Sequence, residues 1–288
     1  MEKILFASDL DGTLLNNRAI VSVEYAKILN DLVDQGCLFT VATAREPGGV
    51  HRALDPTGVR LSAPAVCLNG SLLWDYTADL PVQWFALERG VAGTMIETVL
   101  RHQARGWMFV VNEEGVPLSN YYRDDISLDP RMMAYLRAIQ APYMRAKPLG
   151  EYCGGGEVLE FSCHDHHSNL DAMYEELVQI EGLRVVYYAD TYREGYKFLE
   201  CGSMHAGKGA GAKAAQALVG ADKLYVFGDN FNDRPMYEVA DKSFAPNTAE
   251  PEMQKIATHV IPTHNEGGVI RTIRDLFQQK IPQFFPKP

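Results

Sequence analysis

The chain has 288 residues, of which 47% are hydrophobic and 22% charged, as expected for a globular protein long enough to form two domains. Its net charge of −10 argues against nucleic acid or an anionic membrane as a partner, because both require a basic surface. No apolar stretch is long enough to predict a transmembrane helix.

The N-terminal segment predicts a strand, a loop and a helix in succession. The apolar residues Ile4–Ala7 are typical of a strand buried on both faces, as in a parallel sheet, and Asp9 and Asp11 follow directly. Ser22 is a good cap for a helix over Val23–Gln35. The apolar face of that helix is expected to hold Val23, Ala26, Leu29 and Val33.

Two further strands are predicted before the pattern changes. The second strand covers Cys37–Ala42, and the polar turn Thr43-Ala44-Arg45 follows it. A short helix is expected near Pro47–Leu54. The third strand, Ala65–Leu68, ends in Asn69-Gly70.

Between residues 80 and 200 the strands alternate more between polar and apolar residues, which predicts an α+β insert. The aromatic stretch Tyr187–Tyr196 predicts a hairpin, in which Arg193 could face a substrate. The run Cys163–His167 lacks the spacing of a zinc site, so we expect a solvated loop there. The other predicted elements of the insert are the strands Trp107–Asn112, Val158–Cys163 and Arg184–Tyr188 and the helices Val91–Gln103 and Asn169–Glu181.

The parallel pattern resumes after Gly202. An alanine-rich helix is predicted over Lys208–Leu218 and a buried strand over Leu224–Phe227, with Asp229 and Asp233 after the strand. The remaining predicted elements are a helix at Arg234–Ala240, strands near Ser243–Ala245 and His259–Ile261, and a last helix near Gly268–Gln279.

Two pairs of aspartates therefore follow two buried strands, and ligands of open α/β sheets bind at such carboxyl ends. Carboxylates gathered there repel one another unless a cation lies among them, and oxygen ligands without histidine or thiol favour Mg²⁺ over zinc. In the first pair, one of Asp9 and Asp11 could attack a phosphoryl group while the other moves protons. The structural alternatives are a solvated turn for this pair and a helix cap for Asp229 and Asp233.

Cationic and hydroxyl groups near these acids suit a phosphate. Thr43 could donate its hydroxyl and backbone N–H to a phosphate oxygen, and Arg45 could add positive charge. Lys208 opens a helix, whose N-terminus already attracts anions. Taken singly, a threonine that only satisfies a turn and a surface lysine would be the favoured interpretations of these residues.

These motifs in this order resemble the haloacid dehalogenase superfamily of phosphatases. The run Asp9–Thr13 is similar to its nucleophile loop, and Thr43, Lys208 and Gly228–Asp233 are similar to its other three signatures. The long insert between Thr43 and Lys208 is similar to the α/β cap of the Cof-type sugar-phosphatase branch. Thr-Ala-Arg departs from the Thr-Gly-Arg that is common in the second signature.

The resemblance implies a Rossmann-like, doubly wound parallel-sheet core over residues 1–81 and 195–288, with an inserted α+β cap over residues 82–194. It implies that Asp9 is the nucleophile, which forms an aspartyl-phosphate. Asp11 would protonate the leaving alcohol and then activate water. Mg²⁺ would be held by Asp9, the backbone carbonyl of Asp11 and Asp229.

The resemblance also assigns binding residues. The phosphate would be bound by Thr43, Ala44, Arg45, Lys208 and Asn232. Further candidates for the site are Asp233, Asn69 and Arg193.

The function implied is Mg²⁺-dependent hydrolysis of small phosphorylated metabolites, with sugar phosphates as the expected class. A phosphomutase and a non-catalytic metabolite-binding protein are the alternatives. Five cysteines without a CxxC pair, and an N-terminus without a signal-peptide pattern, predict a reduced, cytoplasmic protein. The oligomeric state stays open.

Overall fold

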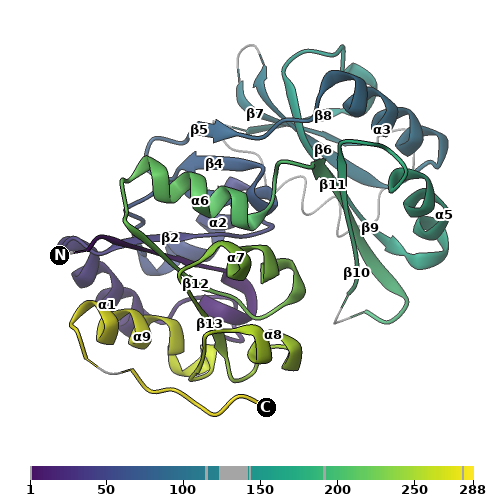
Figure 1. The fold of residues 1–288 in the computed structure, drawn as a ribbon. Helices are drawn as coiled ribbons and strands as arrows, with labels where there is room; N and C mark the ends of the chain where they lie inside the picture. The colour runs from purple at the N-terminus through teal and green to yellow at the C-terminus, as the bar shows by residue number, and fades with distance from the viewer. Residues whose placement is uncertain (1, 114–115, 123–141, 143, 191–192, 281) are drawn as a thin grey trace. The chain divides into compact units, whose positions relative to one another are not determined.

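The computed structural model describes residues 2–113, 116–122, 142, 144–190, 193–280 and 282–288. Contacts within the chain divide it into two units (Figure 1). The first unit comprises Met1–Gln83 and Gly207–Pro288, and the second comprises Trp84–Ala206. Each unit has a sheet and a buried core of its own.

The first unit is built on a sheet of five strands in the order β14-β13-β12-β1-β2, and every neighbouring pair is parallel. A parallel bridge between Ala42 and Val66 brings β3 (Ala65–Cys67) next to β2. Strands buried on both faces are almost wholly apolar, which explains short runs such as that of β1. The five strands are β1 (Ile4–Ser8), β2 (Leu38–Val41), β12 (Lys223–Phe227), β13 (Lys242–Pro246) and β14 (His259–Ile261).

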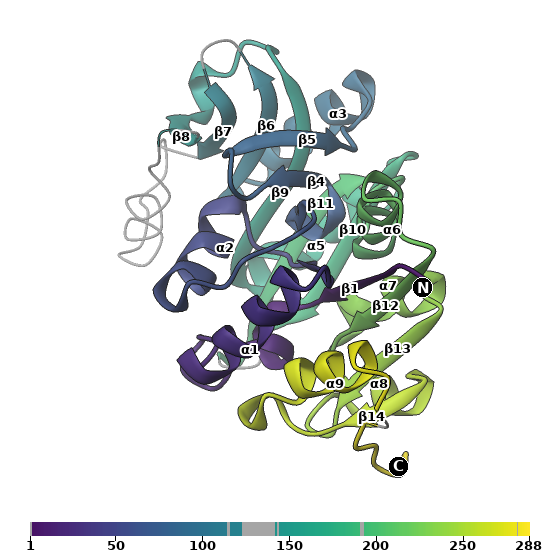
Figure 2. The ribbon, with the colours of Figure 1, turned by 90° about the vertical axis from the view of Figure 1, so that its left-hand side faces the viewer.

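Helices connect these strands and cover the sheet (Figures 1 and 2). Helix α1 packs against α9, and α6 packs against α7. This alternation of parallel strands and helices confirms the predicted doubly wound α/β class. The helices of this unit are α1 (Val23–Asp34), α2 (Pro47–Leu54), α6 (Lys208–Leu218), α7 (Arg234–Val239), α8 (Pro251–Ile256) and α9 (Gly268–Phe277). Strand β3 also pairs with β4 (Leu72–Asp75), which lies beside β5 (Leu80–Trp84).

Helix α1 begins as predicted, and Ala26 and Leu29 of its predicted apolar face are buried, but the buried stripe is shifted around the helix. The Ser22 hydroxyl accepts a hydrogen bond from the backbone N–H of Tyr25 (3.3 Å), which confirms the cap. The predicted burial of Val23 is wrong, since this residue is 73% exposed. At 3.6 residues per turn, Val23 lies roughly 120° around the helix from the middle of the buried stripe. That stripe consists of Ala26, Leu29 and Leu32.

The second unit is an α+β structure, as predicted. Its six strands follow the order β10-β11-β9-β6-β7-β8, and all pairs except β7 with β8 are antiparallel. Helices α3 (Arg89–Arg101) and α5 (His167–Leu177) pack together over β9 and share one apolar core with it. The strands are β6 (Gly106–Glu113), β7 (Val116–Tyr122), β8 (Met144–Pro148), β9 (Glu157–His166), β10 (Leu183–Ala189) and β11 (Tyr196–Ser203).

The histidine-rich run is not the solvated loop that we expected. Strand β9 continues through His166 and pairs with β11, and α5 begins at His167. Cys163 is buried, and Nε2 of His164 lies 2.8 Å from Oδ2 of Asp190. The polar composition hid the alternation of a strand, in which successive side chains point to opposite faces. Within the described residues these histidines join no group of three potential metal ligands.

The predicted aromatic hairpin is confirmed. Strands β10 and β11 pair antiparallel over the whole length of β10. Arg193 lies just before β11, and its guanidinium carbon is 3.3 Å from the centre of the Tyr196 ring. Residues 191 and 192 lie outside the described part of the chain.

All five cysteines are free thiols, and four of them are buried. Burial of this kind fits their expected behaviour as small apolar residues. Among the residues that the structure describes, none of the helices combines the length and the apolar character needed to cross a membrane.

Candidate active site

The register of three strands brings the loops that hold Asp9, Thr43 and Asp229 to the carboxyl ends of the strands in the first sheet. Ser8, the last residue of β1, pairs with Phe227 of β12 and with Val41 of β2. The backbone N–H of Asp9 donates to the carbonyl of Phe227 (2.9 Å), and that of Ala42 donates to the carbonyl of Ser8 (2.8 Å). The loops that follow the three strands therefore leave the sheet at the same level, where α/β proteins bind ligands.

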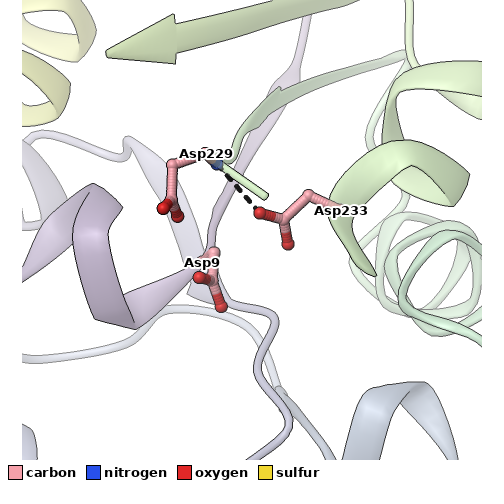
Figure 3. A group of neighbouring side chains, drawn as sticks. All are labelled: Asp9, Asp229 and Asp233. Atoms are coloured by element: carbon pink, nitrogen blue, oxygen red, sulfur yellow. Dashed lines mark hydrogen bonds between the residues drawn. The ribbon is translucent and has the colours of Figure 1, made fainter. Parts of the chain in front are cut away.

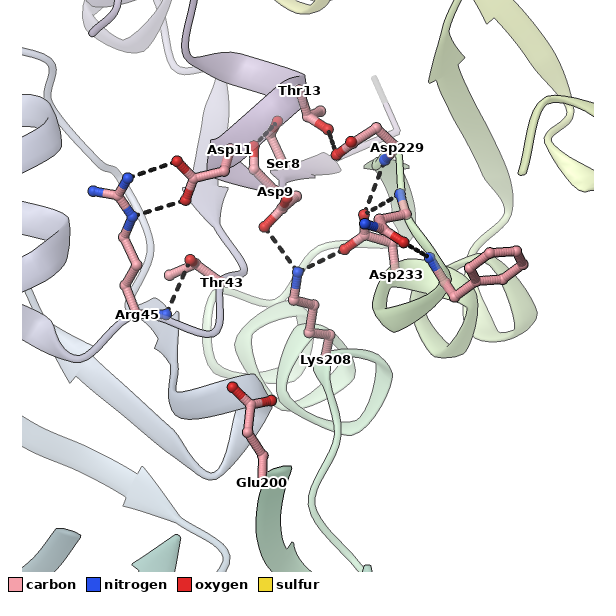
Figure 4. A network of polar contacts seen from close by, with 12 residues as sticks. Ser8, Asp9, Asp11, Thr13, Thr43, Arg45, Glu200, Lys208, Asp229 and Asp233 are labelled. Atoms are coloured by element: carbon pink, nitrogen blue, oxygen red, sulfur yellow. Dashed lines mark hydrogen bonds and ion pairs between the residues drawn. The ribbon is translucent and has the colours of Figure 1, made fainter. Parts of the chain in front are cut away.

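Lys208 joins two buried carboxylates at these strand ends (Figure 4). Its Nζ donates to Oδ1 of Asp9 (2.8 Å) and to Oδ1 of Asp233 (2.6 Å). Lys208 is 2% exposed, so the alternative of a surface lysine is wrong. Burial opposes its charge, but the charges of Asp233 and Asp9 outweigh burial and raise the pKa of Lys208.

Asp9, Asp229 and Asp233 form a cluster of acids (Figure 3). One oxygen of each carboxylate lies within 4.8 Å of the others. Burial, followed by the charge of Asp233, raises the pKa of Asp229 to about 7. Burial also raises the pKa of Asp9, although the attraction of Lys208 opposes it. Three carboxylates face one ammonium group, so the donor set fits a divalent cation such as Mg²⁺.

Within this cluster, Asp233 is held by protein donors. Its Oδ2 accepts from the backbone N–H groups of Asp229 (2.9 Å) and Asn230 (3.2 Å), and its Oδ1 accepts from Lys208. Asp233 and Asn230 also form a capping box around the short helix η5 (Phe231–Asp233). The cap weighed from the sequence is therefore confirmed for Asp233, but the N-cap residue is Asn230 and not Asp229. Asp9 and Asp229 are therefore the better candidates to bind a cation.

The turn after β1 is shaped to receive Asp229. Thr13 Oγ1 donates to Oδ1 of Asp229 (2.7 Å). Gly12 has φ of 75°, and a Cβ on it would lie 2.4 Å from Oδ2 of Asp229. Any side chain at position 12 would therefore displace this carboxylate.

Asp11 lies apart from the acid cluster and contacts Arg45. The side chain of Asp11 is 60% exposed, whereas that of Asp9 is 9% exposed. Arg45 donates from Nε to Oδ2 of Asp11 (2.8 Å) and from Nη2 to Oδ1 (2.6 Å). Its third nitrogen, Nη1, donates to the carbonyl of Gly49 (3.2 Å) in α2.

Thr43 ties together the loops that follow β2 and β3. Its backbone N–H donates to the carbonyl of Val66 (2.8 Å), and its carbonyl accepts from the N–H of Asn69 (3.0 Å). The N–H of Thr43 is thus engaged within the protein. Its hydroxyl accepts from the N–H of Arg45 (3.1 Å) and keeps a proton that it can donate.

Of the remaining candidates, Asn232 lies between Asp229 and Asp233 along the chain and is half-buried. Ala44 follows Thr43 in the same loop. Arg193 belongs to the second unit, where it contacts Tyr196.

Sequence reasoning missed two residues that hold these loops. Glu46 is 4% exposed, and its Oε2 accepts from the N–H of Gly49 (2.6 Å) at the start of α2. Pro47 at the first helical position was a usable signal for that cap. The hydroxyl of Tyr237 donates to the carbonyl of Gly228 (2.7 Å), beneath the Asp229 loop, and nothing in the sequence marks it.

Comparison with known proteins adds to this geometry. The model of the haloacid dehalogenase-like hydrolase family matches residues 6–273. The 5-amino-6-(5-phospho-D-ribitylamino)uracil phosphatase YwtE of Bacillus subtilis (strain 168) is 24% identical, over 94% of this chain and 96% of YwtE. The structure of TM0651 from Thermotoga maritima matches with a TM-score of 0.74 and 21% identity, over 99% of both chains. That of the HAD subclass IIB sugar phosphatase BT4131 matches with a TM-score of 0.69 and 16% identity, over 95% of this chain and 98% of BT4131.

Proposed function

The chain belongs to the haloacid dehalogenase-like hydrolases and is a phosphatase of that family, and on this premise we propose how it acts. It hydrolyses small phosphorylated metabolites with Mg²⁺, through a phosphoryl group carried on Asp9. The observation that supports this proposal most is the convergence of Asp9, Lys208 and Asp229 at one edge of the sheet.

The reaction has two steps. The carboxylate of Asp9 attacks phosphorus, and the bond to the leaving oxygen breaks to give an aspartyl-phosphate. Asp11 gives a proton to the leaving alcohol and then takes one from a water molecule. The oxygen of that water attacks phosphorus and breaks its bond to Asp9, which releases inorganic phosphate and restores the Asp9 carboxylate. Lys208 is 2.8 Å from Asp9, where it opposes the negative charge on the phosphoryl oxygens.

Asp9, the backbone carbonyl of Asp11 and Asp229 would hold the Mg²⁺. When bound, the ion supplies positive charge and orientation for the phosphate. Thr13 fixes Asp229 for this role, and Asp233 holds Lys208 and the Asp229 loop.

The phosphate oxygens would be bound by Lys208, the Thr43 hydroxyl, the loop at Ala44 and Asn232. The resemblance in sequence also implies that Arg45 is among the phosphate-binding residues.

We propose sugar phosphates as the substrate class and the insert as the cap that selects among them. From the sequence we place this cap at residues 82–194, and the second unit, Trp84–Ala206, contains all but the first two of these residues. The name of BT4131, a sugar phosphatase, supports the class. The name of YwtE, a phosphatase of a phosphoribitylamino compound, supports a small phosphorylated metabolite.

A screen of phosphorylated metabolites with Mg²⁺, followed by Asp9→Asn, tests the proposal. The screen should find sugar phosphates among the best substrates. Asp9→Asn keeps the shape of the site but removes the attacking oxyanion, and should lower kcat by about 10⁴–10⁶. A rate near that of the wild type in Asp9→Asn would reject the covalent route.

The same screen separates the alternatives. A phosphomutase would return an isomeric sugar phosphate instead of inorganic phosphate. A non-catalytic binding protein would fail to turn over even a generic aryl phosphate.

A further inference from the structure

The guanidinium group of Arg45 is already committed to partners inside the first unit. Two of its nitrogens donate hydrogen bonds to the two carboxylate oxygens of Asp11, in the parallel bidentate geometry that Arg–carboxylate pairs favour. The third nitrogen donates to the carbonyl of Gly49. All three nitrogens therefore have protein acceptors, whereas the cation that contacts Asp9 is Lys208.

Arg45 is also anchored from below, unlike an ordinary surface ion pair. Its backbone carbonyl accepts from the N–H of Leu68 (3.0 Å), and its N–H is bound to the hydroxyl of Thr43. Gly49, which accepts from Arg45, is itself held by the buried cap Glu46. A Cβ on Gly49 would lie 2.9 Å from Cβ of Arg45, so glycine leaves the room that Arg45 occupies.

Asp11 has no comparable anchor of its own. Its side chain is 60% exposed, and Arg45 is the partner that the described residues give its carboxylate. A proton donor must lie at a set point relative to the leaving oxygen, because a displacement of about 1 Å can cost about 10²-fold in rate. An exposed aspartate free to change rotamer would not keep that position.

We infer that Arg45 is a positioning residue, which fixes the carboxylate of Asp11 for transfer of the leaving group's proton, and is not a ligand of the phosphate. This inference rests on the proposed function, in which Asp11 serves the leaving alcohol. On this inference, Arg45 of the loop after β2 holds Asp11 of the loop after β1 in place.

The test compares two substrates that share the phosphoryl group but differ in their need for a proton. Ribose 5-phosphate releases an alkoxide that must be protonated, whereas acetyl phosphate releases a stable carboxylate. The measured quantity is kcat/KM with Mg²⁺ in the full chain, since it reports transfer to Asp9 and not the later hydrolysis. Inhibition by inorganic phosphate reports phosphate binding separately.

Arg45→Met should lower kcat/KM for ribose 5-phosphate by about 10–100-fold and for acetyl phosphate by less than about 3-fold. The inhibition constant of inorganic phosphate should stay unchanged. Arg45→Lys keeps the charge but lacks the paired N–H donors of the guanidinium group. Its kcat/KM for ribose 5-phosphate should therefore lie between those of Arg45→Met and the wild type. Gly49→Ala, which keeps every charged group and crowds Arg45, should reproduce the same split between substrates.

Arg60→Met is the matched control, because it removes an arginine–aspartate pair with Asp34 elsewhere in this unit and should leave both substrates unaffected. Equal losses for both substrates with weaker inhibition by phosphate would make Arg45 a phosphate ligand and overturn the inference. Unchanged kinetics in Arg45→Met would overturn it as well. Failure of the wild type to hydrolyse acetyl phosphate would instead contradict the proposed function.

Discussion

Three carboxylates lie close to one lysine in the first unit, so negative charge exceeds positive charge there. This excess contributes to the raised pKa values of Asp9 and Asp229. Asp9 and Asp233 are both paired with Lys208, and Asp229 lies close to them. Removing one partner of a buried ion pair leaves an uncompensated charge. No structural reason for a cation at the start of α6 was visible in the sequence, but the ion pairs with Asp9 and Asp233 supply one.

Lys208→Met should therefore affect both stability and catalysis. We expect a loss of about 3–5 kcal/mol in the free energy of unfolding without Mg²⁺, because two buried acids lose their counter-charge. We also expect kcat/KM to fall by about 10²-fold or more, because charge on the phosphoryl oxygens is no longer opposed. Urea unfolding in EDTA and steady-state kinetics measure the two effects. Lys213→Met, at an exposed position of the same helix, should change neither stability nor kcat/KM. If Lys208→Met also left both quantities unchanged, the expectation would be contradicted.

The raised pKa of Asp229 predicts an unusual dependence of stability on pH. Burial and the charge of Asp233 raise this pKa from 3.8 to about 7, so the folded state binds the proton more tightly than the unfolded state. The contribution of the Asp229 proton to the free energy of unfolding is therefore complete below the pKa of the unfolded state. It is lost as pH rises through the pKa of the folded state. Without metal, Tm should fall from about pH 5 to about pH 8 more steeply in the wild type than in Asp229→Asn.

Mg²⁺ should reverse this trend, because it binds the ionised carboxylates. The increase in Tm that Mg²⁺ produces should be larger at about pH 8 than at about pH 5. Calorimetry with and without EDTA checks both statements. Identical dependences of Tm on pH for the wild type and Asp229→Asn would show that ionisation of Asp229 does not cause the loss of stability.

At the scale of elements, α6 brings Lys208 to the site because glycines let it pack closely. A Cβ on Gly211 would lie 2.3 Å from Cγ1 of Val66, and one on Gly209 would lie 2.2 Å from the carbonyl oxygen of Pro235. Glycine costs a helix about 0.5–1 kcal/mol relative to alanine, so these glycines mark close approach on two sides of α6.

Gly211→Ala should consequently destabilise the protein even though alanine favours a helix. The clash with Val66 should outweigh the gain and cost about 1–3 kcal/mol, and activity should fall as Lys208 shifts. Gly93→Ala is the control, because a Cβ there meets nothing within 4 Å, and it should stabilise α3 by about 0.5–1 kcal/mol. Urea unfolding of both variants checks the contrast. Equal stabilisation by both would show that α6 has room to spare.

The elements themselves were largely predictable where hydrophobic pattern and end signals agree. Helices α2 and α6 have the predicted bounds, since Pro47 and the alanine-rich run mark them clearly. Strand β9 was cut short because its last residues are polar on a half-buried face. Contacts such as Arg45 with Asp11 could not be predicted, because side-chain direction at a loop depends on packing between segments far apart in sequence.

At the scale of the whole molecule, the second unit interrupts the first along the chain. The first unit contains Asp9, Asp11, Thr43, Lys208 and Asp229, whereas the second has a separate apolar core beneath its six-stranded sheet. The groups of the first unit that we propose for catalysis act on the phosphoryl group, which all substrates share. They cannot rank one leaving alcohol above another, so we expect that ranking to depend on the second unit.

Arg193→Ala tests this division of labour. Arg193 lies on the hairpin of the second unit, over the ring of Tyr196, where it presents a cation without belonging to the proposed catalytic set. Loss of one polar contact to a leaving alcohol should change relative kcat/KM values among sugar phosphates by about 10-fold. Acetyl phosphate, which has no sugar to recognise, should react as before. Arg101→Ala, which removes an exposed ion pair with Glu176 in the same unit, should leave the ranking intact. If Arg193→Ala lowered all substrates in equal proportion, the second unit would act as a cover for the reaction and not as its selector.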